Sequence, residues 1–221
     1  MSPITHFLAS WVVADAVCEK DRDKMLVACA GILPDLDSLG IVCDVASPAL
    51  GGPETDLYAS LHHFLFHGLA GITVLSVLLA WKAIHKRKVF IWAFLVAHFH
   101  CLCDFVGSRG PTDTREDLWP IFYLGPFTRE HGNLLWEGQW KLNGWQNVSF
   151  TVALLVWVFY AAWKYDRSPF RPIMPKVHRG FVDTLRQRFG DPSEKDYSSG
   201  TTSSVTDSSP DDSSDGSSPS G

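Results

Sequence analysis

Seven side chains of metal-ligand type stand in four separated stretches of this sequence. They are His6, Asp35, Asp37, His62, His67, His100 and Asp104. Imidazole and carboxylate groups are the usual protein ligands of zinc and related divalent ions. The sequence therefore predicts a divalent-metal site, provided that the fold brings the four stretches together.

The spacing within two of these stretches favours convergence. His100 and Asp104 are four residues apart, so on a helix they share one face. His63 and His67 have the same spacing, and His62 converges with His67 if a helix begins between them. The plainer alternative for His100 and Asp104 is a hydrogen-bonded structural pair inside a helical bundle.

The number of ligand-type residues exceeds what one tetrahedral zinc ion uses. This excess favours two ions, an arrangement suited to phosphoester cleavage. Zinc is the metal we expect, with manganese as the other candidate. Asp37 then either bridges a second ion or acts as a general base. The plainer alternative is that Asp35 and Asp37 cap a turn.

Three apolar stretches are candidates to hold these residues in a membrane. Residues 64–83 and 148–163 contain almost no charge, and a hydrocarbon core of ~30 Å needs about 20 such residues. Residues 89–106 begin apolar and then carry His98, His100 and Asp104. Ionisable groups at such depth usually mark function. The alternative is a set of buried helices in a soluble protein.

The other stretches are shorter or more polar. Residues 7–17 and 25–33 are apolar runs around a charged turn at 19–24, which predicts a helical hairpin packed against the spans. Residues 110–143 form a loop too long to be a passive connection; Arg115 and Glu137 are further candidates there. We expect an all-α fold, a polytopic helical membrane bundle with about four to five embedded helices and a disordered C-terminal tail.

Lysine and arginine positions predict the orientation of this bundle. One basic cluster lies at 82–88, between two predicted spans, and another at 164–179, after the last span. Both should face the cytoplasm by the positive-inside rule. The ligand-type residues then fall at the non-cytoplasmic face of the cell's inner or plasma membrane, and the tail lies in the cytoplasm.

Composition divides the chain into three parts. It has 221 residues, is 46% hydrophobic and carries a net charge of −5. We expect a membrane-embedded domain at 1–166, a basic juxtamembrane segment at 167–190 and a disordered tail at 191–221, where Ser and Asp dominate. Membrane lipid is the expected partner, because no long basic stripe indicates nucleic acid. Five cysteines without a CxxC pair argue against a disulfide scaffold or a zinc ribbon.

Five short motifs follow one another along residues 1–125. They are Thr5-His6, Pro34-Asp35-Leu36-Asp37, His62 with His67, His100 with Asp104, and Trp119-Pro120. In this order they resemble the LexA-regulated, membrane-bound metal-dependent hydrolases, an inner-membrane, YdjM-like family. The resemblance implies a hydrolase that cleaves a phosphoester or other ester bond of a lipid-like substrate with metal-activated water. The family is distantly similar to zinc-dependent phospholipases C, which suggests the substrate class.

The chain departs from the family pattern around its central histidines. His63 stands where the family has arginine, and Phe64, Phe66 and Gly68 replace glycine, threonine and serine. These changes affect hydrogen bonding around the ligands and contact with a phosphate group. They leave the ligand-type residues in place and make His63 a candidate proton donor. Asp37 and His63 are therefore the two candidate catalytic residues.

Two other functions remain open. The protein is a non-catalytic membrane metal-binding or transport protein if its intramembrane imidazoles and carboxylates pass ions across the bilayer. The ligand-type residues gather at one face, however, and only His85 offers a comparable group near the other. The protein is a structural or interaction protein if its tail is the working part, through phosphorylation of the tail serines.

Overall fold

The computed structural model describes residues 1–192, which are mostly helical. The described residues form eight α-helices: α1 (Pro3–Val17), α2 (Asp21–Ala30), α3 (Gly40–Ala49), α4 (Leu57–Leu61), α5 (Leu69–Lys82), α6 (Lys86–Gly107), α7 (Trp145–Tyr165) and α8 (Pro175–Phe189). They also form two 3-10 helices, η1 (Pro34–Leu39) and η2 (Arg115–Asp117), and an antiparallel pair of short strands, β1 (Ile121–Phe122) and β2 (Asn133–Leu134). The prediction of an all-α fold is confirmed. The predicted tail lies, from residue 193 on, outside the described residues.

α6 and α7 are the two described helices that are long and apolar enough to cross a membrane alone. They have 22 and 21 residues, or about 33 and 32 Å of helix, which matches a hydrocarbon core of ~30 Å. α2 and the stretch Pro34–Ala49 pass the same test together, although the chain bends by 57° between them. The predicted spans at 89–106 and 148–163 are thus confirmed, and each helix extends beyond its predicted bounds.

The predicted span at 64–83 is wrong in its first part. α5 begins at Leu69 and has 14 residues, about 21 Å, so it is shorter than the membrane core. The preceding residues form a loop because their backbone pairs with another loop: Phe122 N donates to His63 O at 3.1 Å, and Leu69 N donates to Tyr123 O at 2.9 Å. His63 has a left-handed backbone with φ 61°, which interrupts any helix. The expected helical spacing of His63 and His67 is therefore also wrong.

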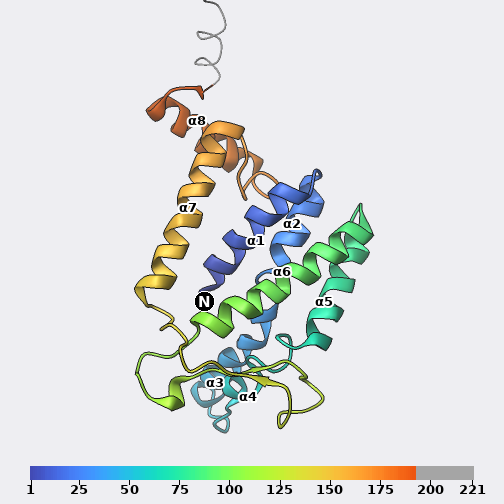
Figure 1. Cartoon of the computed structure of the whole chain (residues 1–221), viewed down its shortest axis with the longest axis vertical. Helices are drawn as coiled ribbons and strands as arrows, with labels where there is room; N and C mark the ends of the chain where they lie inside the picture. The colour runs from blue at the N-terminus through green and yellow to red at the C-terminus, as the bar shows by residue number, and fades with distance from the viewer. Residues whose placement is uncertain (193–221) are drawn as a thin grey trace, which may run out of the picture.

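The hairpin of α1 and α2 lies at the centre of the bundle. Helix α1 packs against α2, α6 and α7, and Figure 1 shows it between α6 and α7. The buried residues Ala14, Ala28 and Ala93 keep the helix axes close together, and Trp11 fills the space beside them with 2% of its surface exposed. The predicted hairpin is confirmed, although α2 begins at Asp21, within the stretch expected to be a turn.

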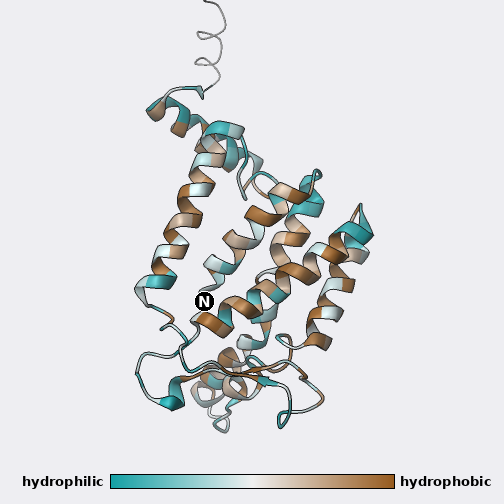
Figure 2. Cartoon of the chain, viewed as in Figure 1, coloured by the Kyte–Doolittle hydropathy of each residue, from teal (hydrophilic) through white to brown (hydrophobic). Residues whose placement is uncertain are grey.

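The two charged turns lie at the same end of the bundle, as the sequence predicts. Asp23 accepts hydrogen bonds from the backbone N of Ile84 at 2.8 Å and of His85 at 3.1 Å, and from Nδ1 of His85 at 2.8 Å. These bonds join the α1–α2 turn to the start of α6. Figure 2 shows hydrophilic residues at this end and hydrophobic residues along the helices. The ligand-type residues lie away from these turns: His6 is near the start of α1, and His100 and Asp104 are near the end of α6, where they meet Asp35 of η1.

Helix α8 lies across the end of α7 and falls within the predicted basic segment at 167–190. Val182 and Leu185 of α8 pack against Ala162 of α7, and Trp163 Nε1 donates to Gly190 O at 2.7 Å. α8 is amphipathic in sequence, with apolar residues toward α7 and basic residues elsewhere, as in helices that lie at a membrane surface. The three domain boundaries stay predictions.

Candidate metal centre

Four potential metal ligands from three chain segments meet at one point. Asp35 comes from η1, His67 from the loop before α5, and His100 and Asp104 from α6; one ligand atom of each lies within 4.8 Å of all the others. His100 Nε2 is 3.0 Å from both His67 Nε2 and Asp104 Oδ2. Asp35 Oδ1 is 3.6 Å from His100 Nε2 and 3.8 Å from His67 Nε2. We call this four-residue group the metal centre.

A backbone carbonyl orients His100. The Nδ1 of His100 donates to Gly31 O at 2.7 Å, so the other ring nitrogen, Nε2, presents its lone pair to the metal centre. Gly31 reaches this position because α1 and the end of α2 approach closely there. A Cβ atom at Gly31 would lie 1.7 Å from Ser10 Oγ, so no other residue fits without displacing α1.

A buried carboxylate orients His67. The Nδ1 of His67 donates to Asp37 Oδ2 at 2.9 Å, and His62 Nδ1 donates to Asp37 Oδ1 at 2.9 Å. Asp37 also accepts from Phe66 N at 3.3 Å and is 2% exposed. Because both its oxygens are engaged, Asp37 is placed to orient imidazoles, as outer carboxylates do around metal-bound histidines. It does not belong to the four-residue metal centre.

The imidazole nitrogens and carboxylate oxygens of the metal centre are arranged as electron-pair donors around a cation would be. His67 and His100 each donate through Nδ1, so their Nε2 atoms face each other 3.0 Å apart, where they share either a proton or an ion. Asp104 Oδ2 and Asp35 Oδ2 are buried without a hydrogen-bond partner. Such groups repel one another unless a proton or a metal ion lies between them. Two imidazoles with two carboxylates are a ligand set that fits a divalent ion.

The electrostatics of the two nearby loop histidines differ. Burial alone lowers the pKa of His67, but its contacts with the carboxylates of Asp104 and Asp37 outweigh burial and raise that pKa to about 9. Without a metal ion, His67 therefore holds a proton at neutral pH, and an ion that binds must displace it. Burial lowers the pKa of His63 well below 6.5, so His63 is a neutral imidazole.

His6 contacts the metal centre through Asp104. Its Nε2 donates to Asp104 Oδ1 at 3.1 Å, and its ring lies 3.8 Å from that of His100, centroid to centroid. The amino group of Met1 contacts the same carboxylate oxygen. His6 is 2% exposed, and its Nδ1 has no partner. The sequence predicts His6 as a ligand; the structure places it as a donor to a ligand, outside the four-residue metal centre.

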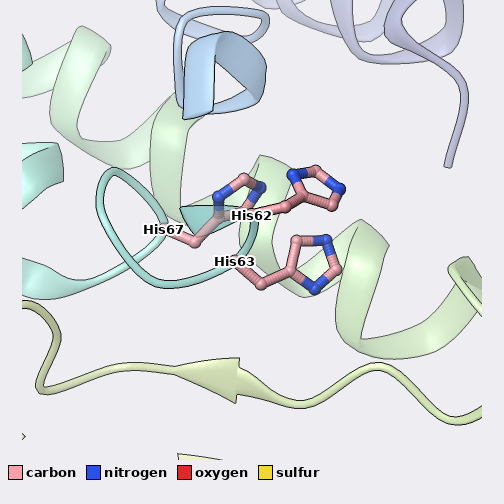
Figure 3. Close-up of side chains that lie close together, drawn as sticks. All are labelled: His62, His63 and His67. Atoms are coloured by element: carbon pink, nitrogen blue, oxygen red, sulfur yellow. The ribbon is translucent and has the colours of Figure 1, made fainter. Parts of the chain in front are cut away.

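The imidazoles of His62, His63 and His67 come from one loop and lie together, as Figure 3 shows. One nitrogen of each lies within 4.8 Å of the others, so they form a second potential metal group that shares His67 with the first. His67 serves one group at a time while its Nδ1 stays bonded to Asp37. Trp119 lies edge-on to His62 and His63, with ring centroids 5.5 and 5.6 Å away. The predicted second ion stays a prediction.

A cavity of about 440 Å³ opens beside the metal centre. Its lining includes Asp35, Asp104 and His63, together with Tyr58, Arg109 and Trp119. The Nε of Arg109 is buried without a hydrogen-bond partner. Sequence analysis missed Tyr58 and Arg109. The available signal for Arg109 was its place five residues after Asp104, just beyond the end of α6.

Other candidates from the sequence lie apart from the metal centre. Arg115 and Glu137 form an exposed ion pair with each other at 3.4 Å. His98 points toward β1 and the loop after it, where its Nε2 is 3.0 Å from the hydroxyl of Tyr123.

Asp37→Asn is expected to weaken metal binding by about 10–100-fold, the usual loss when an outer partner of a metal-bound histidine is removed. Asparagine offers one oxygen and one N–H group, so it cannot accept from both His62 and His67. If His67 then moves its hydrogen to Nε2, it loses the lone pair that faces the ion. Competition titration with a chromophoric chelator measures the affinity.

Asp44→Asn is the matched control, because Asp44 accepts from the backbone of Leu57 and Tyr58 at 2.8 Å and contacts no imidazole. It should leave metal affinity unchanged. Equal losses in the two variants would mean that Asp37 acts only through general stability.

Comparisons with known proteins give one match. A family model described as YdjM inner membrane protein matches residues 1–169. No curated protein matches the chain, and no solved structure does. The looser resemblance to zinc-dependent phospholipases C therefore stays a prediction.

Proposed function

The chain belongs to the YdjM inner membrane protein family, and from this premise we propose that it is a membrane-bound, metal-dependent hydrolase of ester bonds in lipid-like molecules. The observation that carries the proposal is the metal centre: two imidazole nitrogens and two carboxylates converge within 4.8 Å, with two carboxylate oxygens lacking any partner. The site adjoins a cavity of about 440 Å³, so a substrate has room beside it.

His67, His100, Asp35 and Asp104 hold the ion in this proposal. Zinc suits a four-ligand set of nitrogen and oxygen, and manganese is the second candidate. A divalent ion bound there lowers the pKa of water and so supplies a nucleophile at neutral pH. Asp37 and the carbonyl of Gly31 keep the two imidazoles in the binding tautomer.

His63 is the proposed proton-transfer residue. It lines the cavity, its Nε2 lies 3.9 Å from Asp104 Oδ2, and its buried Nδ1 has no partner. A neutral imidazole in this place accepts a proton from the attacking water and returns it to the leaving group. This role replaces that of Asp37, whose two oxygens are already engaged.

Arg109 and the position of the cavity indicate the substrate class. Arg109 lines the cavity with an unpartnered Nε, and a guanidinium is well suited to an anionic group such as a phosphoester. The metal centre lies near the end of the apolar helix α6, where an amphipathic ester places its polar bond at the membrane boundary. The basic turns at the other end of the bundle favour a cytoplasmic location there, and hence a non-cytoplasmic site.

Metal-dependent cleavage is the direct test. The full chain is purified in detergent, stripped with a chelator and reloaded with zinc or manganese. It is then assayed on phosphomonoester, phosphodiester and carboxylester amphiphiles. We expect one class to be cleaved by the reloaded protein and not by the stripped protein. Asp104→Asn protein purified in parallel controls for contaminating hydrolases. A protein that binds metal stoichiometrically and cleaves nothing in the panel is a metal-binding protein and not a hydrolase.

A further inference from the structure

A second cavity of about 440 Å³ lies between α6 and α7 and is almost wholly apolar. Phe99, Leu102 and Val106 of α6 line one side of it, and Trp145 and Phe150 of α7 line the other. The α6 residues Phe99 to Val106 follow a helical stripe about 10 Å long. Because α6 and α7 are the candidate membrane spans, this cavity lies where hydrocarbon, and not water, is the surrounding medium. We call it the apolar groove.

The apolar groove adjoins the metal-site cavity. Met1 lines both of them. The consecutive residues Cys103 and Asp104 face different cavities: Cys103 lines the apolar groove, and Asp104 lines the metal-site cavity. The apolar groove and the metal-site cavity therefore adjoin at two consecutive residues of α6. Trp140 and Trp145, which also line the groove, are residues typical of the boundary between headgroups and hydrocarbon.

We propose that the apolar groove binds the hydrocarbon chain of the substrate while the ester bond lies at the metal centre. This inference rests on the proposed function and names its substrate class as an amphipathic ester with a long chain. The paired cavities match the two parts of such a molecule: carboxylates, imidazoles and Arg109 for the polar group, and aromatic and aliphatic side chains for the chain. Other membrane lipids that fill the groove by partition alone are the alternative occupants, and the test separates them.

Ser149→Trp is the variant that fills the groove. Ser149 lines the groove and is exposed there, so an indole occupies the space of the chain without entering the protein core. Val148→Trp is the matched control, because Val148 is the neighbouring residue, is 53% exposed and does not line the groove. Leu102→Trp on α6, with Leu95→Trp as its control, provides a second pair if Ser149→Trp does not fold. Melting temperatures check that each variant is folded.

The probes are butyl phosphonate and dodecyl phosphonate, which carry the same metal-binding head group on chains of different length. Apparent Kd values are measured by titration of the zinc-loaded full chain in lipid nanodiscs. In the parent protein and in Val148→Trp, dodecyl phosphonate should bind at least about tenfold more tightly, since even two buried methylene groups give such a gain. In Ser149→Trp the ratio of the two Kd values should fall toward one.

An equal ratio in Ser149→Trp and Val148→Trp would overturn the inference, because the gain would then come from partition into the bilayer. A parent protein without chain-length dependence, or without phosphonate binding, would overturn it too. The proposed function fails separately: binding in the expected pattern without cleavage of any ester leaves the groove and refutes the hydrolase. Cleavage of short-chain esters without chain-length dependence would support the hydrolase and refute the binding of a hydrocarbon chain in the groove.

Discussion

Asp104→Asn is expected to lower zinc affinity by at least about 100-fold, more than the ~10–100-fold typical of losing an outer partner. Asp104 Oδ2 is buried, has no hydrogen-bond partner and lies 3.0 Å from His100 Nε2. Its negative charge offsets the charge of an ion at a site where Asp104 itself is only 2% exposed. Asparagine keeps the shape of the side chain and removes that charge.

Asp23→Asn is the control for this variant. Asp23 is also buried and also bonded to an imidazole, that of His85, but at the other end of the bundle. Its loss should lower the melting temperature and leave zinc affinity unchanged. Metal content of the purified proteins and chelator competition provide the readouts. Unchanged zinc affinity in Asp104→Asn would mean that the four-residue group is not the metal centre.

His63→Gln is expected to reduce kcat by about 100–10,000-fold, the range for loss of a general acid–base group, while metal content stays unchanged. His63 borders the substrate cavity and is not one of the four ligands. Glutamine fills a similar volume and forms hydrogen bonds but does not transfer a proton near neutral pH. The comparison requires kcat on the substrate class that the metal-reloaded protein cleaves, and the metal content of the same sample.

The control here is His98→Gln, since the nitrogens of His98 contact Phe94 O and the Tyr123 hydroxyl, away from the metal centre. It should keep nearly full kcat. A His63→Gln protein that loses its metal together with its activity would identify His63 as a ligand and would remove the proposed proton-transfer role.

Helix periodicity explains what could be predicted. His100 and Asp104 converge because four residues make about one turn of α6, and the apolar lengths of α6 and α7 are evident in the sequence. The α1–α2 hairpin follows from two apolar runs around a charged turn. Each of these predictions depends on a pattern within one short stretch of sequence. Such a local pattern does not depend on contacts with distant parts of the chain.

Long-range contacts explain what could not be predicted. The apolar residues 64–66 led to the prediction that a helical span begins before His67. The backbone of this loop instead pairs with Phe122 and Tyr123, which are far away in sequence. Asp37 is predicted as a ligand from its place beside Asp35, and the hydrogen bonds that its oxygens accept from His62 and His67 are not evident in the sequence. The carbonyl that orients His100 belongs to Gly31, and no sequence pattern marks a backbone acceptor.

The dispersed origin of the ligands has a consequence for biogenesis. Asp35, His67 and His100 come from three segments far apart in the chain, which are synthesised one after another. No coordination shell exists until all of them have docked, and the Gly31 carbonyl requires the α1–α2 hairpin as well. If the metal centre holds an ion as proposed, the ion is therefore acquired late, by chains in which these segments have already docked.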